Sequence, residues 1–164
     1  MKTNRILDLI GNTPLVEARS LIDKKEVRLL LKMEGNNPGG SVKDRPALNM
    51  IKSALERKEI DHHSRLIEAT SGNTGIALAM IAGIYKLNME LVMPENSTKE
   101  RVQTMRAYGA KVTLTSASNG IEGSRDYAEM KVAKEGFFML NQFANPDNWK
   151  AHYKTTGPEI WRDT

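Results

Sequence analysis

Residues 66–82, LIEATSGNTGIALAMIA, join a short apolar run to a longer one through a polar loop. The run at 66–69 has the length of a strand and the run at 76–82 begins a helix, so the loop lies between a strand end and a helix start. Unpaired N–H groups, small hydroxyls and an asparagine converge there, and glycines let a ligand approach the backbone. The pattern predicts a site for a small anion, with an ordinary capped turn as the alternative.

The alternation of strand and helix continues on both sides of this segment. Strand patterns are expected at 65–69, 89–93, 111–114 and 137–141, and helical patterns at 44–58, 74–86, 97–108, 120–135 and from about 147. Strands separated by helices form a parallel sheet through right-handed crossovers, which predicts an α/β fold. The runs at 15–18 and 27–32 flank a polar turn and are expected to pair with each other.

Lys43 is a second candidate for chemistry, in the segment NNPGGSVKDR at 36–45. It follows a glycine-rich turn at a helix start, where backbone N–H groups and the nearby Arg45 disfavour the ammonium form and favour a neutral, nucleophilic amine. Such an amine forms a Schiff base with a carbonyl compound. The P-loop pattern GxxxxGK[ST] is excluded, because the required lysine does not follow Gly40. A solvated lysine at a helix start remains the alternative.

Several separated motifs resemble one enzyme family. They are PGGSVKDR at 38–45, EATSGNTGIALA at 68–79, NQF at 141–143, NPDN at 145–148 and TGPEIW at 156–161. In this order they resemble the pyridoxal phosphate (PLP)-dependent cysteine synthases, also called O-acetylserine sulfhydrylases. The segments that are more similar to the B isozyme than to the A isozyme are GNNP at 35–38, MRAYGA at 105–110 and AHY at 151–153.

The resemblance implies a role for each matching residue. Lys43 matches the lysine that holds PLP covalently and, once released, shuttles the substrate α-proton. Asn73 matches the asparagine that hydrogen-bonds the phenolic oxygen of the cofactor. The residues that match those gripping the substrate α-carboxylate are Thr70, Ser71, Thr74 and Gln142. These four residues are expected to line one crevice at the carboxyl ends of the strands.

The reaction that the resemblance implies is a β-replacement in cysteine biosynthesis. O-acetyl-L-serine loses acetate, and sulfide adds in its place to give L-cysteine. The B-type motifs suggest thiosulfate as a second sulfur donor. The implied partners are these small molecules and further copies of the chain, in a homodimer or a higher assembly.

The resemblance also implies a fold and a division into domains. The fold is PLP fold type II, similar to the tryptophan synthase β subunit, with helices on both faces of a parallel four-stranded small domain. Residues 1–35 would be the first elements of the large domain, 36–145 the small domain, and 146–164 the start of the return into an incomplete large domain. In the family, the residues that hold the PLP phosphate belong to the second half of the sequence, which this chain does not include. The truncated chain is therefore expected to be inactive alone.

Composition argues against several other classes of protein. The chain is 40% hydrophobic and 27% charged, as in a globular domain rather than a disordered one. It has no cysteine, and His62 and His63 are adjacent rather than four residues apart, so no metal site is expected. A net charge of +4, scattered among acids without interleaved aromatics, argues against nucleic-acid binding. The first residues lead into no long apolar run, so no membrane span and a cytoplasmic location are expected.

Two alternatives stay open at this point. One is a relative with the same chemistry on another substrate, such as a cystathionine β-synthase or a phosphoserine-using synthase. The other is a non-catalytic, truncated paralogue that kept the fold. The presence of Lys43, Asn73 and Gln142 argues against long neglect of the site.

Overall fold

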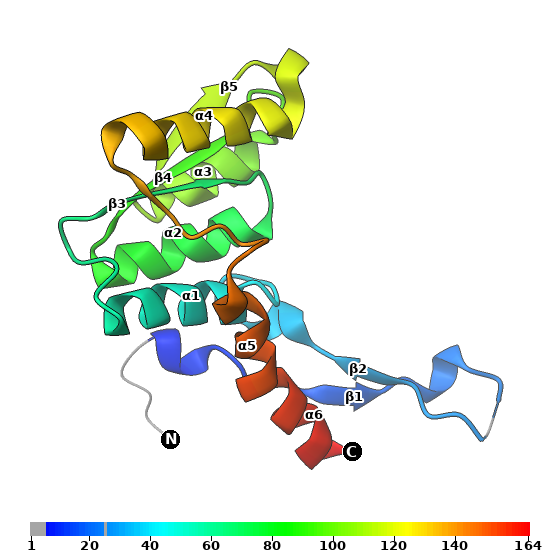
Figure 1. Ribbon diagram of the computed structural model, residues 1–164. Coiled ribbons are helices and arrows are strands. Elements are labelled where there is room, and N and C mark those ends of the chain that lie inside the picture. The colour runs from blue at the N-terminus through cyan, green and yellow to red at the C-terminus, as the bar shows by residue number, and fades with distance from the viewer. Residues whose placement is uncertain (1–5, 25) are drawn as a thin grey trace.

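Four strands form a parallel sheet in the order β5-β4-β3-β6 in the computed structural model, which describes residues 6–24 and 26–164. The strands are β3 (Arg65–Ala69), β4 (Asn88–Pro94), β5 (Lys111–Thr115) and β6 (Phe138–Met139). Helix α4 (Gly120–Glu135) covers one face, and α2 (Asn73–Tyr85) and α3 (Lys99–Ala107) cover the other (Figure 1). Helix α1 (Asp44–Glu56) packs against α2. The expected α/β fold, with a parallel four-stranded sheet and helices on both faces, is confirmed.

The two central strands are buried on both faces, as their apolar sequences require. Leu66 and Ile67 of β3 and Leu91 and Val92 of β4 are fully buried. Helix α2 is apolar on all sides, and this suits its position, since α1, α3 and the sheet surround it and leave little of its surface to solvent. A smaller apolar cluster under α4 fills the opposite face.

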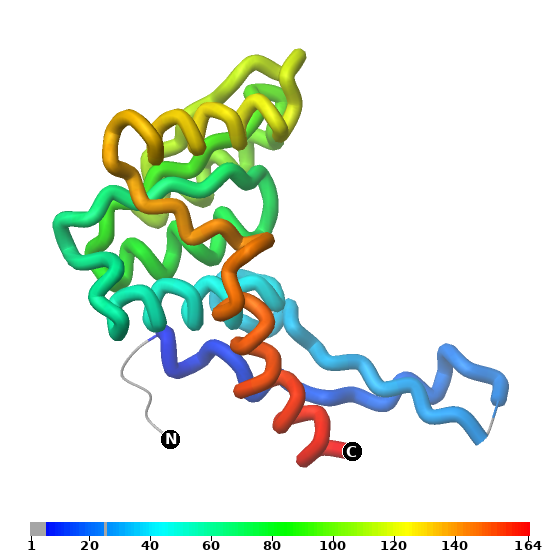
Figure 2. The backbone as a smooth tube through the Cα atoms, viewed as in Figure 1, coloured from blue at the N-terminus to red at the C-terminus, as the bar shows by residue number. Residues whose placement is uncertain are grey.

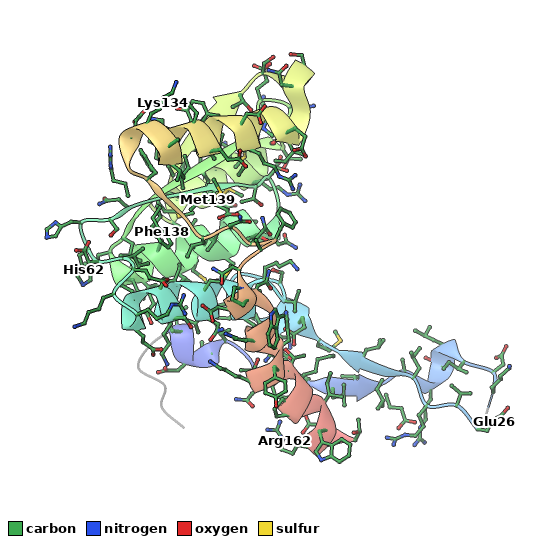
Figure 3. The ribbon with its side chains drawn as sticks, viewed as in Figure 1. Glu26, His62, Lys134, Phe138, Met139 and Arg162 are labelled. Atoms are coloured by element: carbon green, nitrogen blue, oxygen red, sulfur yellow. The ribbon has the colours of Figure 1, made fainter. Side chains whose placement is uncertain are left out.

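Two elements differ from the sequence-based expectation. The strand expected at 137–141 pairs with β3 only at Phe138 and Met139, which Figure 3 labels, because Asn141 adopts a left-handed conformation (φ +54°) and turns the chain away. The last helix is two helices, α5 (Pro146–Lys154) and α6 (Thr156–Asp163). Pro158 has no N–H with which to continue the hydrogen bonds of α5, so the chain begins a new helix.

The segment before α1 contains an antiparallel hairpin. As expected, its strands β1 (Leu15–Glu17) and β2 (Leu30–Lys32) pair with each other and not with the parallel sheet. Figure 2 shows the hairpin extending away from the sheet, with α6 beside its base. Short 3-10 helices occur at Ile6–Leu9, Arg19–Leu21, Glu34–Asn36 and Ala117–Asn119.

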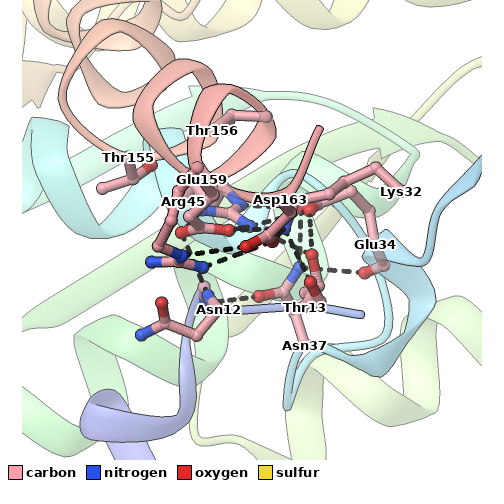
Figure 4. Close-up of polar contacts among 12 residues, drawn as sticks. Asn12, Thr13, Lys32, Glu34, Asn37, Arg45, Thr155, Thr156, Glu159 and Asp163 are labelled. Atoms are coloured by element: carbon pink, nitrogen blue, oxygen red, sulfur yellow. Dashed lines mark hydrogen bonds and ion pairs between the residues drawn. The ribbon is translucent and has the colours of Figure 1, made fainter. Parts of the chain in front are cut away.

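A buried guanidinium joins the hairpin, α1 and α6 (Figure 4). The Arg45 side chain is 1% exposed and bonds two carboxylates. Its Nε and Nη2 donate to Glu34 at 2.7 and 2.8 Å, and its Nη1 and Nη2 donate to Glu159 at 2.6 and 2.7 Å. A Cβ atom at Gly11 would lie 3.1 Å from Arg45 Nη1, so the close approach of the N-terminal segment favours glycine there.

Further donors complete the coordination of both carboxylates. Thr13 Oγ1 donates to Glu34 at 2.6 Å, and Lys32 Nζ lies 2.8 Å from Glu159. Burial by itself would raise the pKa of Glu159, but the hydrogen bonds from Arg45 and Lys32 lower it to about 2. At Glu34, burial by itself would raise the pKa, but the hydrogen bonds from Arg45 and Thr13 outweigh it and lower the pKa. Both groups are therefore ionised at neutral pH and bind Arg45 as charged partners.

Replacing Arg45 with methionine should destabilise the fold strongly. The substitution leaves the buried Glu159 and the partly buried Glu34 without their shared cation, and removing one partner of a buried ion pair typically costs about 3–5 kcal/mol of unfolding free energy. Urea denaturation followed by circular dichroism measures the loss. The matched control is Arg162→Met, because Arg162 is exposed and ion-paired with its neighbour Asp163, and this variant should unfold like the wild type. An Arg45→Met protein with an unchanged unfolding midpoint would show that the network is not needed for stability.

Candidate functional site

The carboxyl ends of β3 and β6 lie where the direction of strand addition reverses. From β3 the chain adds β4 and then β5 on one side, and it returns to place β6 on the other side of β3. The connections on the two sides of such a switch point diverge and leave a crevice between them. The loop at 70–72 follows β3 and the turn at 140–145 follows β6, so both reach this point.

The two segments are joined by one side-chain contact. Thr74 Oγ1 donates a hydrogen bond of 2.8 Å to Gln142 Oε1, across 68 residues of sequence. The structure therefore brings together two of the four residues expected to grip a carboxylate. Thr70 lies buried at the start of the same loop, and Ser71 follows it, partly buried.

Several N–H donors at the start of α2 have no internal acceptor. Gly72 is the N-cap residue and offers no side chain to cap the helix. Within the described part of the chain, no group accepts a hydrogen bond from the backbone N–H of Asn73 or Thr74, or from Nε2 of Gln142. These donors and the helix start favour an anion such as a carboxylate. Since the Thr74 hydroxyl donates to Gln142, Thr74 would offer a ligand its backbone N–H.

Lys43 lies at the start of α1, as its N-cap residue. Its backbone N–H donates to Ser41 Oγ at 3.2 Å. The preceding turn requires a glycine at position 40, where φ is +83°. The Asp44 carboxylate accepts a hydrogen bond from the Gly39 N–H, which fastens this turn to the first residue of the helix.

The lysine and the carboxylate loop occupy the same end of two packed helices. Helices α1 and α2 lie side by side, and in Figure 1 both begin at the same end of the molecule. Asn73, the first residue of α2, is exposed. The Lys43 ammonium makes no hydrogen bond or ion pair within the described ranges, which leaves it available to a ligand.

Sequence reasoning did not assign three residues that contact this region or lie near it. Glu68 accepts hydrogen bonds from the backbone of the Gln142 turn, and Asn148 Nδ2 donates to Gln142 O at 2.6 Å. His152 of α5 lies near Lys43: burial lowers the pKa of its imidazole, and the charges of Lys43 and Arg45 lower it further. A single charge inside the apolar run at 66–69 was the available signal for Glu68.

The described residues contain neither a metal-binding cluster nor a membrane-spanning helix. His62 and His63 lie in an exposed turn, and Figure 3 shows His62 at the edge of the molecule. Residues 6–24 and 26–164 contain no group of three or more histidine, aspartate or glutamate side chains placed to hold a metal ion. None of the helices in these ranges has the length and apolar character needed to span a membrane.

The groups at the shared end of α1 and α2 would fit part of a PLP site. Lys43 offers a primary amine for the cofactor carbonyl, and Asn73 offers an amide at the start of the neighbouring helix. The unpaired donors of Thr74 and Gln142 suit the carboxylate of an amino-acid substrate. This set of donors is the chemistry expected where a lysine-bound cofactor meets an amino acid.

Comparison with known proteins identifies close relatives. Residues 6–164 match the family described as pyridoxal-phosphate dependent enzymes. A cysteine synthase B of Pseudomonas syringae pv. syringae is 55% identical over 159 residues, which cover 97% of this chain and 94% of that protein. A cysteine synthase B of Escherichia coli (strain K12) is 56% identical over 156 residues, covering 94% of this chain and 51% of that protein. A solved cysteine synthase from Entamoeba histolytica is 37% identical, with a TM-score of 0.96 over 99% of this chain and 50% of that one.

The matches agree in family and fold and differ in length. The chain spans about half the length of the Escherichia coli relative and of the Entamoeba histolytica structure, and most of the Pseudomonas syringae relative. The structural match confirms the expected fold type II, and the stronger sequence matches agree with the B-type motifs. The chain belongs to the pyridoxal-phosphate-dependent enzyme family and is cysteine synthase B-like within it.

Proposed function

We propose that residues 1–164 supply the lysine and the substrate-carboxylate site of an enzyme that makes L-cysteine from O-acetyl-L-serine and sulfide by β-replacement. Thiosulfate is the proposed second donor. The hydrogen bond between Thr74 and Gln142 carries the proposal, because it joins two distant segments next to unpaired N–H donors at the start of α2. The cytoplasmic location and the domain division at 35/36 and 145/146 stay predictions.

Each residue has a distinct task in this proposal. PLP, when bound, supplies the electron sink that makes the substrate α-proton acidic and the β-substituent a leaving group. The Lys43 amine holds the cofactor and then takes the α-proton as a general base. Asn73 donates to the phenolic oxygen of the cofactor. The N–H groups of Asn73 and Thr74 and the amide of Gln142 hold the substrate carboxylate, which orients the α-carbon toward the lysine.

Lys43 should be the residue that reacts with the cofactor. Incubating the 164-residue chain with excess PLP, reducing with borohydride and mapping peptides by mass spectrometry should find the pyridoxyl group on Lys43. Lys43→Ala should lose this label and the accompanying absorbance. The matched control, Lys52→Ala, removes an exposed lysine of the same helix and should keep both. A label confined to another lysine would rule out the assignment.

Gln142 should contribute to substrate binding and not to cofactor binding. Residues 1–164 fused to the second half of the Escherichia coli relative provide an enzyme for this test, called here the fusion enzyme. Gln142→Ala removes a hydrogen bond to a charged group, so the KM for O-acetyl-L-serine should rise about tenfold or more, with the cofactor absorbance unchanged. Gln103→Ala, at an exposed position on α3, is the control and should leave KM unchanged. Equal KM values in the two variants would place the carboxylate elsewhere.

The 164-residue chain by itself should show negligible cysteine synthesis and should self-associate. In the family it resembles, the contacts to the PLP phosphate lie in the half that this chain does not cover, so cofactor binding should be weak. Apolar side chains are also exposed on the hairpin and α6, with exposed fractions of 48% for Val27, 38% for Leu31 and 87% for Trp161. Exposed apolar patches favour association into a dimer or a larger assembly. Light scattering and a sulfide-dependent cysteine assay test both statements; an active, monodisperse monomer would refute them.

A further inference from the structure

We propose that Glu68 is a positioning residue for substrate binding: its buried carboxylate fixes the backbone of Asn141 and Gln142 and thereby aims the Gln142 amide at the substrate carboxylate. The substrate part of this inference rests on the proposed function. The anchoring part concerns the geometry of the chain alone.

The carboxylate of Glu68 binds two successive N–H groups. Its Oε2 accepts from the Asn141 N–H at 2.9 Å and its Oε1 accepts from the Gln142 N–H at 3.1 Å. The donors lie 73 and 74 residues further along the chain, so the contact depends on the pairing of β3 with β6. Glu68 is 3% exposed and is the next-to-last residue of β3. The carboxylate therefore lies at the strand end that borders the crevice.

The hydrogen bonds that Glu68 accepts hold a left-handed turn of the backbone. Asn141 has φ +54°, a left-handed conformation that is uncommon outside glycine but that asparagine adopts more readily than most residues. Its own side chain supports the turn by accepting a hydrogen bond from the Ala144 N–H at 3.3 Å, and Glu68 holds the turn from the sheet side. In this conformation the N–H groups of residues 141 and 142 both reach the same carboxylate. Glu68 thus fixes the turn that ends β6 and presents Gln142.

The Glu68 carboxylate lies in the apolar run at 66–69, where an apolar side chain would fill the same space. Its neighbours in β3, Leu66 and Ile67, are fully buried and apolar. Burial raises the pKa of Glu68, and the hydrogen bonds from Gln142 and Asn141 and the charge of Arg125 offset only part of that rise. A carboxylate accepts stronger hydrogen bonds than a neutral oxygen, so it holds the two N–H groups more firmly than an amide would.

The remaining atoms of Gln142 are also held, except for the donor that a substrate needs. Asn148 Nδ2 donates to its backbone oxygen at 2.6 Å, and Thr74 Oγ1 donates to its side-chain oxygen at 2.8 Å. With the N–H, the C=O and Oε1 all occupied, Nε2 is left with both hydrogens free of described acceptors. A preoriented amide loses less conformational entropy on binding than a mobile one.

Hydrogen exchange of the 164-residue chain, followed by NMR, tests the anchoring. In Glu68→Ala the amides of Asn141 and Gln142 should exchange about tenfold faster or more, while those of β4 keep the wild-type rates. Glu68→Gln keeps the size of the side chain and one accepting oxygen, so it should give a smaller acceleration and remain folded. The matched control is Glu90→Gln, because Glu90 is equally buried, at 3%, but binds Lys111 and Thr113 instead. Wild-type exchange at residues 141 and 142 in both Glu68 variants would overturn the proposal.

Kinetics of the fusion enzyme test the link to substrate. Glu68→Gln should raise the KM for O-acetyl-L-serine about three- to tenfold, with a smaller change in kcat and an unchanged cofactor absorbance. Glu90→Gln should leave all three values unchanged. If Gln142→Ala raises KM and Glu68→Gln does not, the positioning role is wrong while the proposed function stands. If Gln142→Ala itself leaves KM unchanged, the proposed carboxylate site fails and the role of Glu68 in serving it fails with it.

Discussion

The buried guanidinium of Arg45 is the contact on which the arrangement of the terminal segments depends. It binds Glu34 before α1 and Glu159 in α6, which lie 11 and 114 residues away in sequence. A guanidinium with two carboxylates satisfies its donors in a fixed, planar geometry, which an apolar contact would not impose. Because Arg45 follows Lys43 by two residues, the network also fixes where the first turn of α1 lies, and with it the candidate reactive lysine.

Glu68 has a corresponding structural role at the carboxyl end of β3. Arg45 follows Lys43 by two residues in α1, and Glu68 accepts a hydrogen bond from the backbone N–H of Gln142. Each is a buried charge whose partners come from distant segments, and each stands next to a residue proposed to bind cofactor or substrate. Burying a charge is costly unless every bond to it is made, so both contacts penalise displacement of the turns that they hold.

Much of the fold and part of the site follow from local pattern. The apolar runs of β3 and β4 and the helical periods between the strands predicted a parallel sheet. The loop after β3 predicted a site for a small anion, and the glycine-rich turn before Lys43 predicted a nucleophilic amine. The limits were also local. The strand at 137–141 is shorter than its apolar sequence suggests, because Asn141 turns toward Glu68, and the helix after 146 breaks before Pro158. An apolar run indicates which residues are buried, but it does not indicate where the hydrogen bonding between two strands stops.

The sequence by itself determined the class of fold, the residue types at the site and, through the motifs, the family. Only the tertiary structure decided the strand order β5-β4-β3-β6, which places the end of β6 beside the end of β3. That order brings Thr74 to Gln142 and Glu68 to the turn at Asn141. Periodicity is a property of neighbouring residues, whereas the partners of a buried charge are chosen by the packing of whole elements, so no pattern along the chain could have named them.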